Sequence, residues 1–164
     1  MKIRDITVSA ILIALTIIIL YLNLLLPIST LSILTLASLL VPIALIKSSI
    51  KSAFSVYIIS SIIGFFILPI NIISLYASFF GIYGIIKYYI EKINKFYLEI
   101  ILKLIFFNII LVISFFVFNS VLAIGSISLP IWLFFLVAQP IFFIFDYALT
   151  LLISFYMQKI HNKI

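Results

Sequence analysis

The sequence predicts an all-α, polytopic membrane protein, a six-helix transmembrane bundle with both termini cytoplasmic. Hydrophobic residues make up 67% of its 164 residues, charged residues only 9%, and the mean hydropathy is +1.51. Soluble domains are about half apolar and a quarter charged, so this chain has too few polar side chains to cover a globule in water. We therefore expect lipid around most of the surface and a single integral membrane domain over residues 1–164.

The first apolar run covers about residues 6–26 and follows the charged opening MKIRD. A signal peptide also opens with basic residues, but its apolar region is only about 7 to 15 residues long and leads to a small-residue cleavage site. This run is longer and no such site follows it. We predict a retained transmembrane helix, because about 20 apolar residues cross the hydrocarbon core.

Five more apolar runs follow, separated by charges, prolines and short polar turns, over residues 31–46, 52–68, 70–87, 97–119 and 130–157. Since a chain in lipid must satisfy its own backbone, each run is predicted to be a helix. The second, third and fourth runs are short, which leaves a tilted or re-entrant segment open as an alternative.

The charges between the runs fall on alternate sides. Lys2 and Arg4 precede the first run, and Lys47 and Lys51 lie between the second and third. Between the fourth and fifth runs are Lys87, Glu91, Lys92 and Lys95, and after the sixth are Lys159, His161 and Lys163. The other loops contain no Lys or Arg. By the positive-inside rule, we expect both termini in the cytoplasm of a multi-pass protein of the cell membrane.

One carboxylate, Asp146, lies about twelve residues from the cytoplasmic end of the sixth span, near the middle of the bilayer. So short a side chain cannot reach the interface, and a charge at this depth costs a few kcal/mol unless it has a partner inside the bundle. Asn108 in the fifth span has a similar depth. We expect Asn108 to hold Asp146, with Lys103 as a further candidate.

Trp132 and Gln139 lie fourteen and seven residues before Asp146, so a helix keeps all three on a narrow stripe of one face. Pro140 interrupts the backbone hydrogen bonds beside Gln139, as happens where a helix lines a cavity. The functional interpretation is an outward-opening pocket for a small apolar or aromatic ligand with one cationic or hydrogen-bonding group. The structural alternative is a buried polar contact, a kink and an interfacial tryptophan.

Further polar groups are expected near the outer ends of the spans, namely Asn23, Asn71, Tyr76 and Asn119. Each could be a helix cap or a headgroup contact, but as a convergent group they extend the candidate pocket. The predicted substrate-binding set is Asp146, Gln139, Trp132, Asn108, Tyr76 and Asn119.

Two pairs have the Glu–Lys spacing of intrahelical ion pairs: Glu99 with Lys103, and Lys87 with Glu91, where we expect a solvated face. Small residues four apart predict close helix packing in the first, third and fourth spans: Ala10 and Ala14; Ser60 and Gly64; Ala77 and Gly81, with Gly84.

Catalysis and nucleic-acid binding find no support. The chain has no Cys and one His, in the charged tail, and no paired carboxylates, phosphate loop or G-x-S-x-G motif. We expect no enzyme, no metal site and no cofactor.

The size, the six spans and the opening, in which KIRD leads into Ala10-Ile-Leu-Ile-Ala14, resemble the substrate-binding S components of energy-coupling-factor transporters. The resemblance implies that Ala10 and Ala14 dock on a membrane T component driven by two ATPases. It also implies a small-molecule substrate near the outer side, under the loop LPISTL. The metal-binding branch of that family has a histidine-led N-terminus, which this sequence lacks, so the resemblance points to a vitamin-like substrate.

A second function class stays open. The chain could be a structural or assembly subunit of a membrane complex with no ligand of its own, in which the small-residue faces are the working surfaces and Asp146 is a satisfied core group.

Overall fold

The computed structural model describes residues 3–25, 29–122 and 131–159, and for residues 115–122, 131 and 134 it describes the backbone alone. Within these ranges the regular elements are helical and no strand occurs. Six helical segments are long and apolar enough to cross a membrane. The predicted all-α class and the six spanning helices are confirmed, and the chain is a multi-pass membrane protein.

The elements are α1 (Ile3–Leu25), α2 (Thr30–Lys47), α3 (Ile50–Ile67), α4 (Ile70–Leu75), a π-helical turn η1 (Tyr76–Phe80), α5 (Gly81–Glu91), α6 (Phe96–Leu122) and α7 (Ile131–Lys159). Each predicted span begins and ends within four residues of its helix. The fourth span is composed of α4, η1 and α5, which follow one another without a break and together cover Ile70–Glu91.

The chain divides into two compact units, Met1–Lys95 and Phe96–Ile164, and each is described by itself. The first unit contains α1 to α5 and the second contains α6 and α7. The single domain expected over residues 1–164 stays a prediction, as does the cytoplasmic side of the termini.

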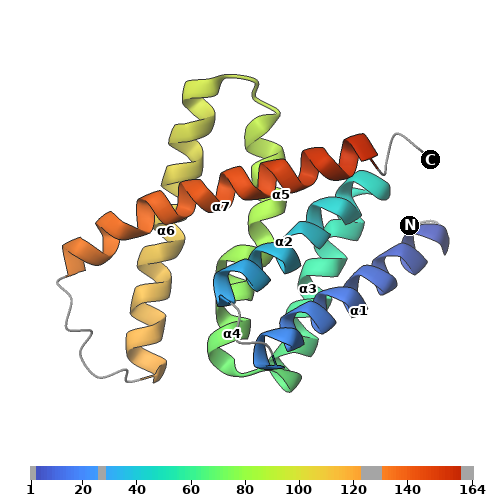
Figure 1. Ribbon diagram of the computed structural model, residues 1–164, viewed down its shortest axis with the longest axis horizontal. Helices are drawn as coiled ribbons and strands as arrows, with labels where there is room; N and C mark the ends of the chain where they lie inside the picture. Colours follow the sequence, from blue (N-terminus) through green and yellow to red (C-terminus); the bar gives the residue numbers. More distant parts are fainter. Residues whose placement is uncertain (1–2, 26–28, 123–130, 160–164) are drawn as a thin grey trace. The chain divides into compact units, whose positions relative to one another are not determined.

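Helix α2 is the central helix of the first unit, because it packs against α1, α3, η1 and α5 (Figure 1). Its residues Leu34 and Val41 are fully buried. A Cβ atom at Gly84 of α5 would lie 2.6 Å from Cδ of Pro42 in α2, so glycine is what allows this approach. The predicted close packing at Gly84 is confirmed.

Glycines also permit close contacts around α3. A Cβ atom at Gly64 would collide with the Ile73 side chain of α4, and one at Gly81 would lie 2.7 Å from the ring of Tyr57 in α3. The small residues predicted in the third and fourth spans therefore lie where helix backbones meet neighbouring side chains.

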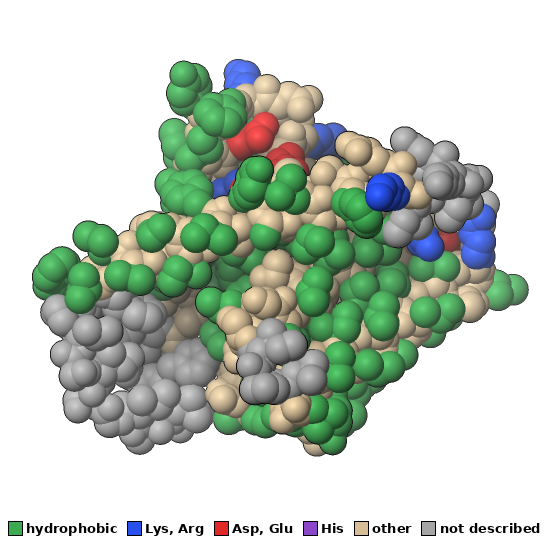
Figure 2. Space-filling model, viewed as in Figure 1, with side chains coloured by type: hydrophobic (Ala, Val, Ile, Leu, Met, Phe, Trp, Pro, Cys, Tyr) green, Lys and Arg blue, Asp and Glu red, His purple; other side chains and the backbone are tan. Residues whose placement is uncertain are grey.

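Helices α6 and α7 of the second unit are 27 and 29 residues long, and α7 continues through Pro140. On α6, Ile101, Ile105, Ile109 and Ile113 recur every four residues and are each about half exposed. Lys103 and Leu111, on another face, are buried. Hydrophobic side chains cover much of the visible surface of the described residues, as a lipid-facing protein requires (Figure 2).

Candidate functional site

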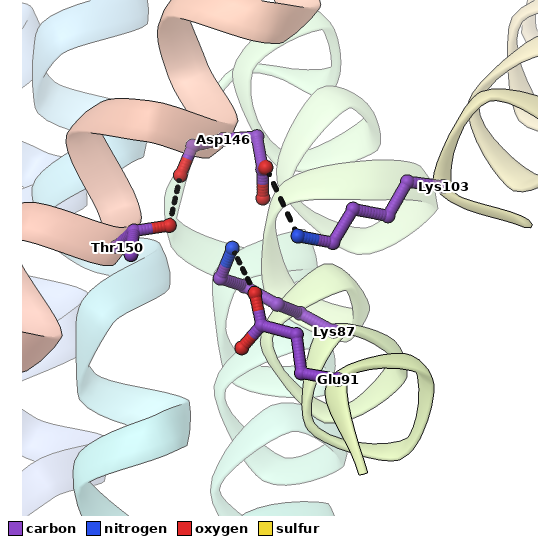
Figure 3. A network of polar contacts seen from close by, with 5 residues as sticks. All are labelled: Lys87, Glu91, Lys103, Asp146 and Thr150. Atoms are coloured by element: carbon purple, nitrogen blue, oxygen red, sulfur yellow. Dashed lines mark hydrogen bonds and ion pairs between the residues drawn. The ribbon is translucent and has the colours of Figure 1, made fainter. Parts of the chain in front are cut away.

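Asp146 of α7 is paired with Lys103 of α6. The Lys103 ammonium donates a hydrogen bond from Nζ to Oδ2 of Asp146 at 3.1 Å (Figure 3). Both side chains are largely buried, at 10% exposure for Lys103 and 18% for Asp146. Two opposite charges in contact remove most of the cost of placing either one inside a membrane. The structure thus supplies the partner that Asp146 required.

An amide pair joins the same two helices. Gln139 donates from Nε2 to Oδ1 of Asn108 at 3.0 Å and to the carbonyl of Phe135 at 3.3 Å. Asn108 donates from Nδ2 to the carbonyl of Leu104 at 2.8 Å. Asn108 was expected to hold Asp146, and this prediction is wrong, because its amide bonds Gln139 instead.

The register of the two helices explains the exchange of partners. Between the two polar pairs, the rings of Phe107 and Phe142 stack with centroids 4.5 Å apart. Going forward along α6 from Lys103 to Asn108 corresponds to going backward along α7 from Asp146 to Gln139, as in helices that run in opposite directions. Gln139 precedes Asp146 by seven residues, or about two helical turns. Because Asn108 bonds Gln139, it meets α7 about two turns away from the Asp146 carboxylate. We call Lys103, Asn108, Gln139 and Asp146 the polar strip.

Trp132 lies at the start of α7 and is 67% exposed, so it does not join the polar strip in a closed site. It is on the stripe predicted with Gln139 and Asp146, about two turns beyond Gln139. Asn119 lies on α6, and its side chain is outside the described residues.

The polar strip also bears on the kind of ligand that the sequence suggested. A cationic group was expected to meet Asp146, and in the structure the ammonium of Lys103 occupies that place. A ligand cation would have to displace this ammonium, whereas a neutral hydrogen-bonding group would compete only with the amide pair of Asn108 and Gln139.

Tyr76 belongs to the first unit and is fully buried at the start of η1. Nearby, Tyr57 of α3 donates its hydroxyl proton to the carbonyl of Ala77 at 2.7 Å. Ser60, one turn after Tyr57, is also fully buried. Sequence reasoning assigned no site role to Tyr57 or Ser60, and the only signal was the small-residue pair of Ser60 and Gly64.

The other polar residues near the span ends differ in exposure. Asn71 is exposed, and Asn23 is partly buried with its side-chain oxygen enclosed. Their convergence with Tyr76 on one pocket stays a prediction.

Lys87 and Glu91 form the predicted intrahelical ion pair on α5, with Nζ and Oε1 2.7 Å apart (Figure 3). The expected solvated face is wrong for Lys87, whose side chain is only 2% exposed, whereas that of Glu91 is 39% exposed. The hydrocarbon stem of a lysine can be buried when its ammonium meets a carboxylate near an interface.

Ala10 and Ala14 lie on α1 and are both exposed. They are one turn apart and share a face, between the exposed side chains of Ile3, Thr7, Leu15 and Ile18. This face offers a partner helix two adjacent positions with no bulky side chain.

No group of three or more His, Cys, Asp or Glu residues in the described part of the chain could hold a metal ion. Comparison with protein-family models, with curated proteins and with solved structures finds no match to this chain.

Proposed function

We propose that this chain is the substrate-binding subunit of an energy-coupling-factor type transporter of the cell membrane. In this role it binds a vitamin-like micronutrient, while a separate membrane T component and two ATPase subunits supply the energy for uptake. The proposal keeps the predicted substrate-binding residues on α6 and α7 and the predicted docking residues on α1.

The observation that carries the proposal is the exposure of Ala10 and Ala14 on the same face of α1. Small residues four apart allow two helix backbones to approach closely. In lipid no hydrophobic effect drives two helices together, so the van der Waals packing of this close approach is what stabilises their contact. Along α1 the neighbouring exposed positions carry bulky Ile3, Ile11 and Leu15.

The docking face is tested by purification of the tagged chain from its native membrane in mild detergent, followed by mass spectrometry of the proteins. We expect a polytopic T component and two ATPases with the wild type, and their loss with Ala10→Leu/Ala14→Leu. The control is Ile11→Leu/Ile18→Leu, which changes exposed residues of α1 without adding volume. Unchanged recovery of the partners with the leucine-filled face would refute this docking role.

The substrate is tested by mass spectrometry of small molecules in the same preparations. We expect a metabolite that is enriched with the wild type and reduced with Gln139→Leu, because a neutral polar group of the ligand would compete for this amide. Lys92→Met, at an exposed position outside the polar strip, is the matched control. Equal metabolite content in the two variants would argue against a substrate site on the strip.

A second function is favoured by one specific observation. The polar strip consists of two bonded pairs, Lys103 with Asp146 and Asn108 with Gln139, as expected in the core of a structural or assembly subunit that binds no ligand. In that case Asp146→Asn would weaken assembly or have no effect, with no metabolite lost. Co-purification of an unrelated membrane complex in place of a T component would make the assembly role the leading one.

A further inference from the structure

The end of α5 carries an exposed surface of aromatic and basic side chains. Tyr88 and Tyr89 are 44% and 51% exposed, and their rings meet edge to face with centroids 5.7 Å apart. Lys92 and Lys95 follow along the chain and are both exposed. We call these four residues the α5 end patch, and all of them belong to the first unit.

The helix places Lys92 beside the two tyrosines. The Lys92 N–H donates to the carbonyl of Tyr88 at 3.2 Å, so the helical turn that contains the tyrosines continues to Lys92. Side chains three and four residues apart are neighbours on the surface of a helix. Lys92 is four residues after Tyr88 and three after Tyr89, and therefore shares their face of α5.

Asn94 ends the helix and keeps the second lysine close to its end. The φ angle of Asn94 is 55°, in the left-handed region, where asparagine commonly follows the last turn of a helix. Its N–H donates to the carbonyl of Glu91 at 3.2 Å, which closes a tight turn. Lys95 comes directly after this turn, before α6 begins (Figure 1).

The charge at this end of α5 is positive. Three lysines against one glutamate, namely Lys87, Lys92, Lys95 and Glu91, leave a net charge of +2. Glu91 already contacts Lys87 at 2.7 Å, so these two charges offset each other. No carboxylate of the described residues contacts Lys92 or Lys95. The two remaining ammonium groups are therefore available to an anion.

The helix dipole accounts for only part of the patch. A cation at the C-terminus of a helix is stabilising, which suits Lys92, the residue that caps α5. Lys95 lies outside the helix, and the dipole gives no reason for two exposed tyrosines beside Lys92. Tyrosine is enriched where lipid meets water, because its ring is apolar and its hydroxyl is polar. The fourth span ends at Glu91, so the patch lies at this boundary.

We propose that the α5 end patch binds the headgroup of an anionic phospholipid. The two ammonium groups donate charge-assisted hydrogen bonds to the phosphate, while the tyrosine rings lie against the glycerol and the upper acyl chains. A zwitterionic headgroup is a poorer ligand, because its own cation faces the same lysines. The inference does not depend on the transport function, since it rests on residues of α5 and its final turn alone.

The test is native mass spectrometry of the full chain in a mild detergent, titrated with phosphatidylglycerol and separately with phosphatidylcholine. We expect the wild type to bind phosphatidylglycerol more tightly. Lys92→Gln/Lys95→Gln should weaken the tightest phosphatidylglycerol binding about 25-fold, or about fivefold for each lysine, and leave phosphatidylcholine binding unchanged. Tyr88→Ala/Tyr89→Ala should weaken the binding of both lipids, because ring contacts do not depend on headgroup charge.

Lys47→Gln/Lys51→Gln is the matched control. It removes the same charge from the turn between α2 and α3, where no aromatic residue lies between the two lysines. All substituted positions are exposed, so the variants should keep the fold. We expect the control to bind phosphatidylglycerol as the wild type does. An equal loss in the two lysine variants would show that net charge alone attracts the lipid and would overturn the proposal, as would an unchanged affinity of Lys92→Gln/Lys95→Gln.

Discussion

Lys103→Met is expected to destabilise the protein more than Asp146→Asn, because it removes the ammonium that a short carboxylate contacts at 3.1 Å inside the membrane. At 3.1 Å, two unit charges attract by about 5 kcal/mol when the effective dielectric constant is about 20. Desolvation of both charges offsets much of this attraction, so the pair adds little over an apolar contact. Removing one partner is different, and leaving the other charge buried costs about 3 to 5 kcal/mol.

The two partners should not be equivalent. Lys103 is seven residues from the start of α6, about 10 Å along the helix, and its long side chain can extend toward that end. Asp146 has no such freedom. With Asp146→Asn, moreover, the amide oxygen still accepts a bond from Lys103. We therefore expect Asp146→Asn to cost about 1 to 3 kcal/mol, less than Lys103→Met.

The assay is the apparent melting temperature of the purified chain in one detergent. The loss expected for Lys103→Met corresponds to a decrease of about 6 to 20 °C for a protein of this size. Lys103→Met/Asp146→Leu should return to near the wild-type value, since an apolar pair of similar volume replaces the ion pair. Lys95→Met, at an exposed lysine just before α6, is the control. Additive losses in the double variant, or a greater loss for Asp146→Asn than for Lys103→Met, would refute the reasoning.

Three further predictions use the same measurement. Gly84→Ala should cost about 1 to 3 kcal/mol of stability, and more than Gly64→Ala. The new Cβ meets the rigid ring of Pro42 at position 84, whereas at position 64 it meets the movable end of the Ile73 side chain. Equal losses for the two variants would contradict this. Tyr57→Phe should cost about 1 to 3 kcal/mol by leaving the Ala77 carbonyl in η1 without its bond, with Tyr97→Phe at an exposed site as control. Asn108→Leu should cost only about 0.6 to 1.7 kcal/mol, because Gln139 keeps its hydrogen bond to the Phe135 carbonyl. A loss of stability as large as that of Lys103→Met would show that the amide pair stabilises the protein more than this.

The candidate site could be predicted only in part from the sequence. Depth along a helix follows directly from residue number, so the need of Asp146 for a partner and the choice between Asn108 and Lys103 were both visible. The correct choice required the register between α6 and α7, which no local pattern contains. In the same way, the sequence placed Tyr76 near a span end but could not show that this residue is fully buried at the start of η1.

The sequence by itself determined that this is an all-α membrane protein with six spanning helices, and it located the ends of each span to within four residues. The physical reason is that lipid imposes a fixed length and apolarity on every span, so the signal lies in consecutive residues. The tertiary structure decided which faces meet. It paired Asp146 with Lys103, buried Lys87 and Tyr76, and left Ala10 and Ala14 exposed, because rotation and register of packed helices depend on side chains far apart in the chain.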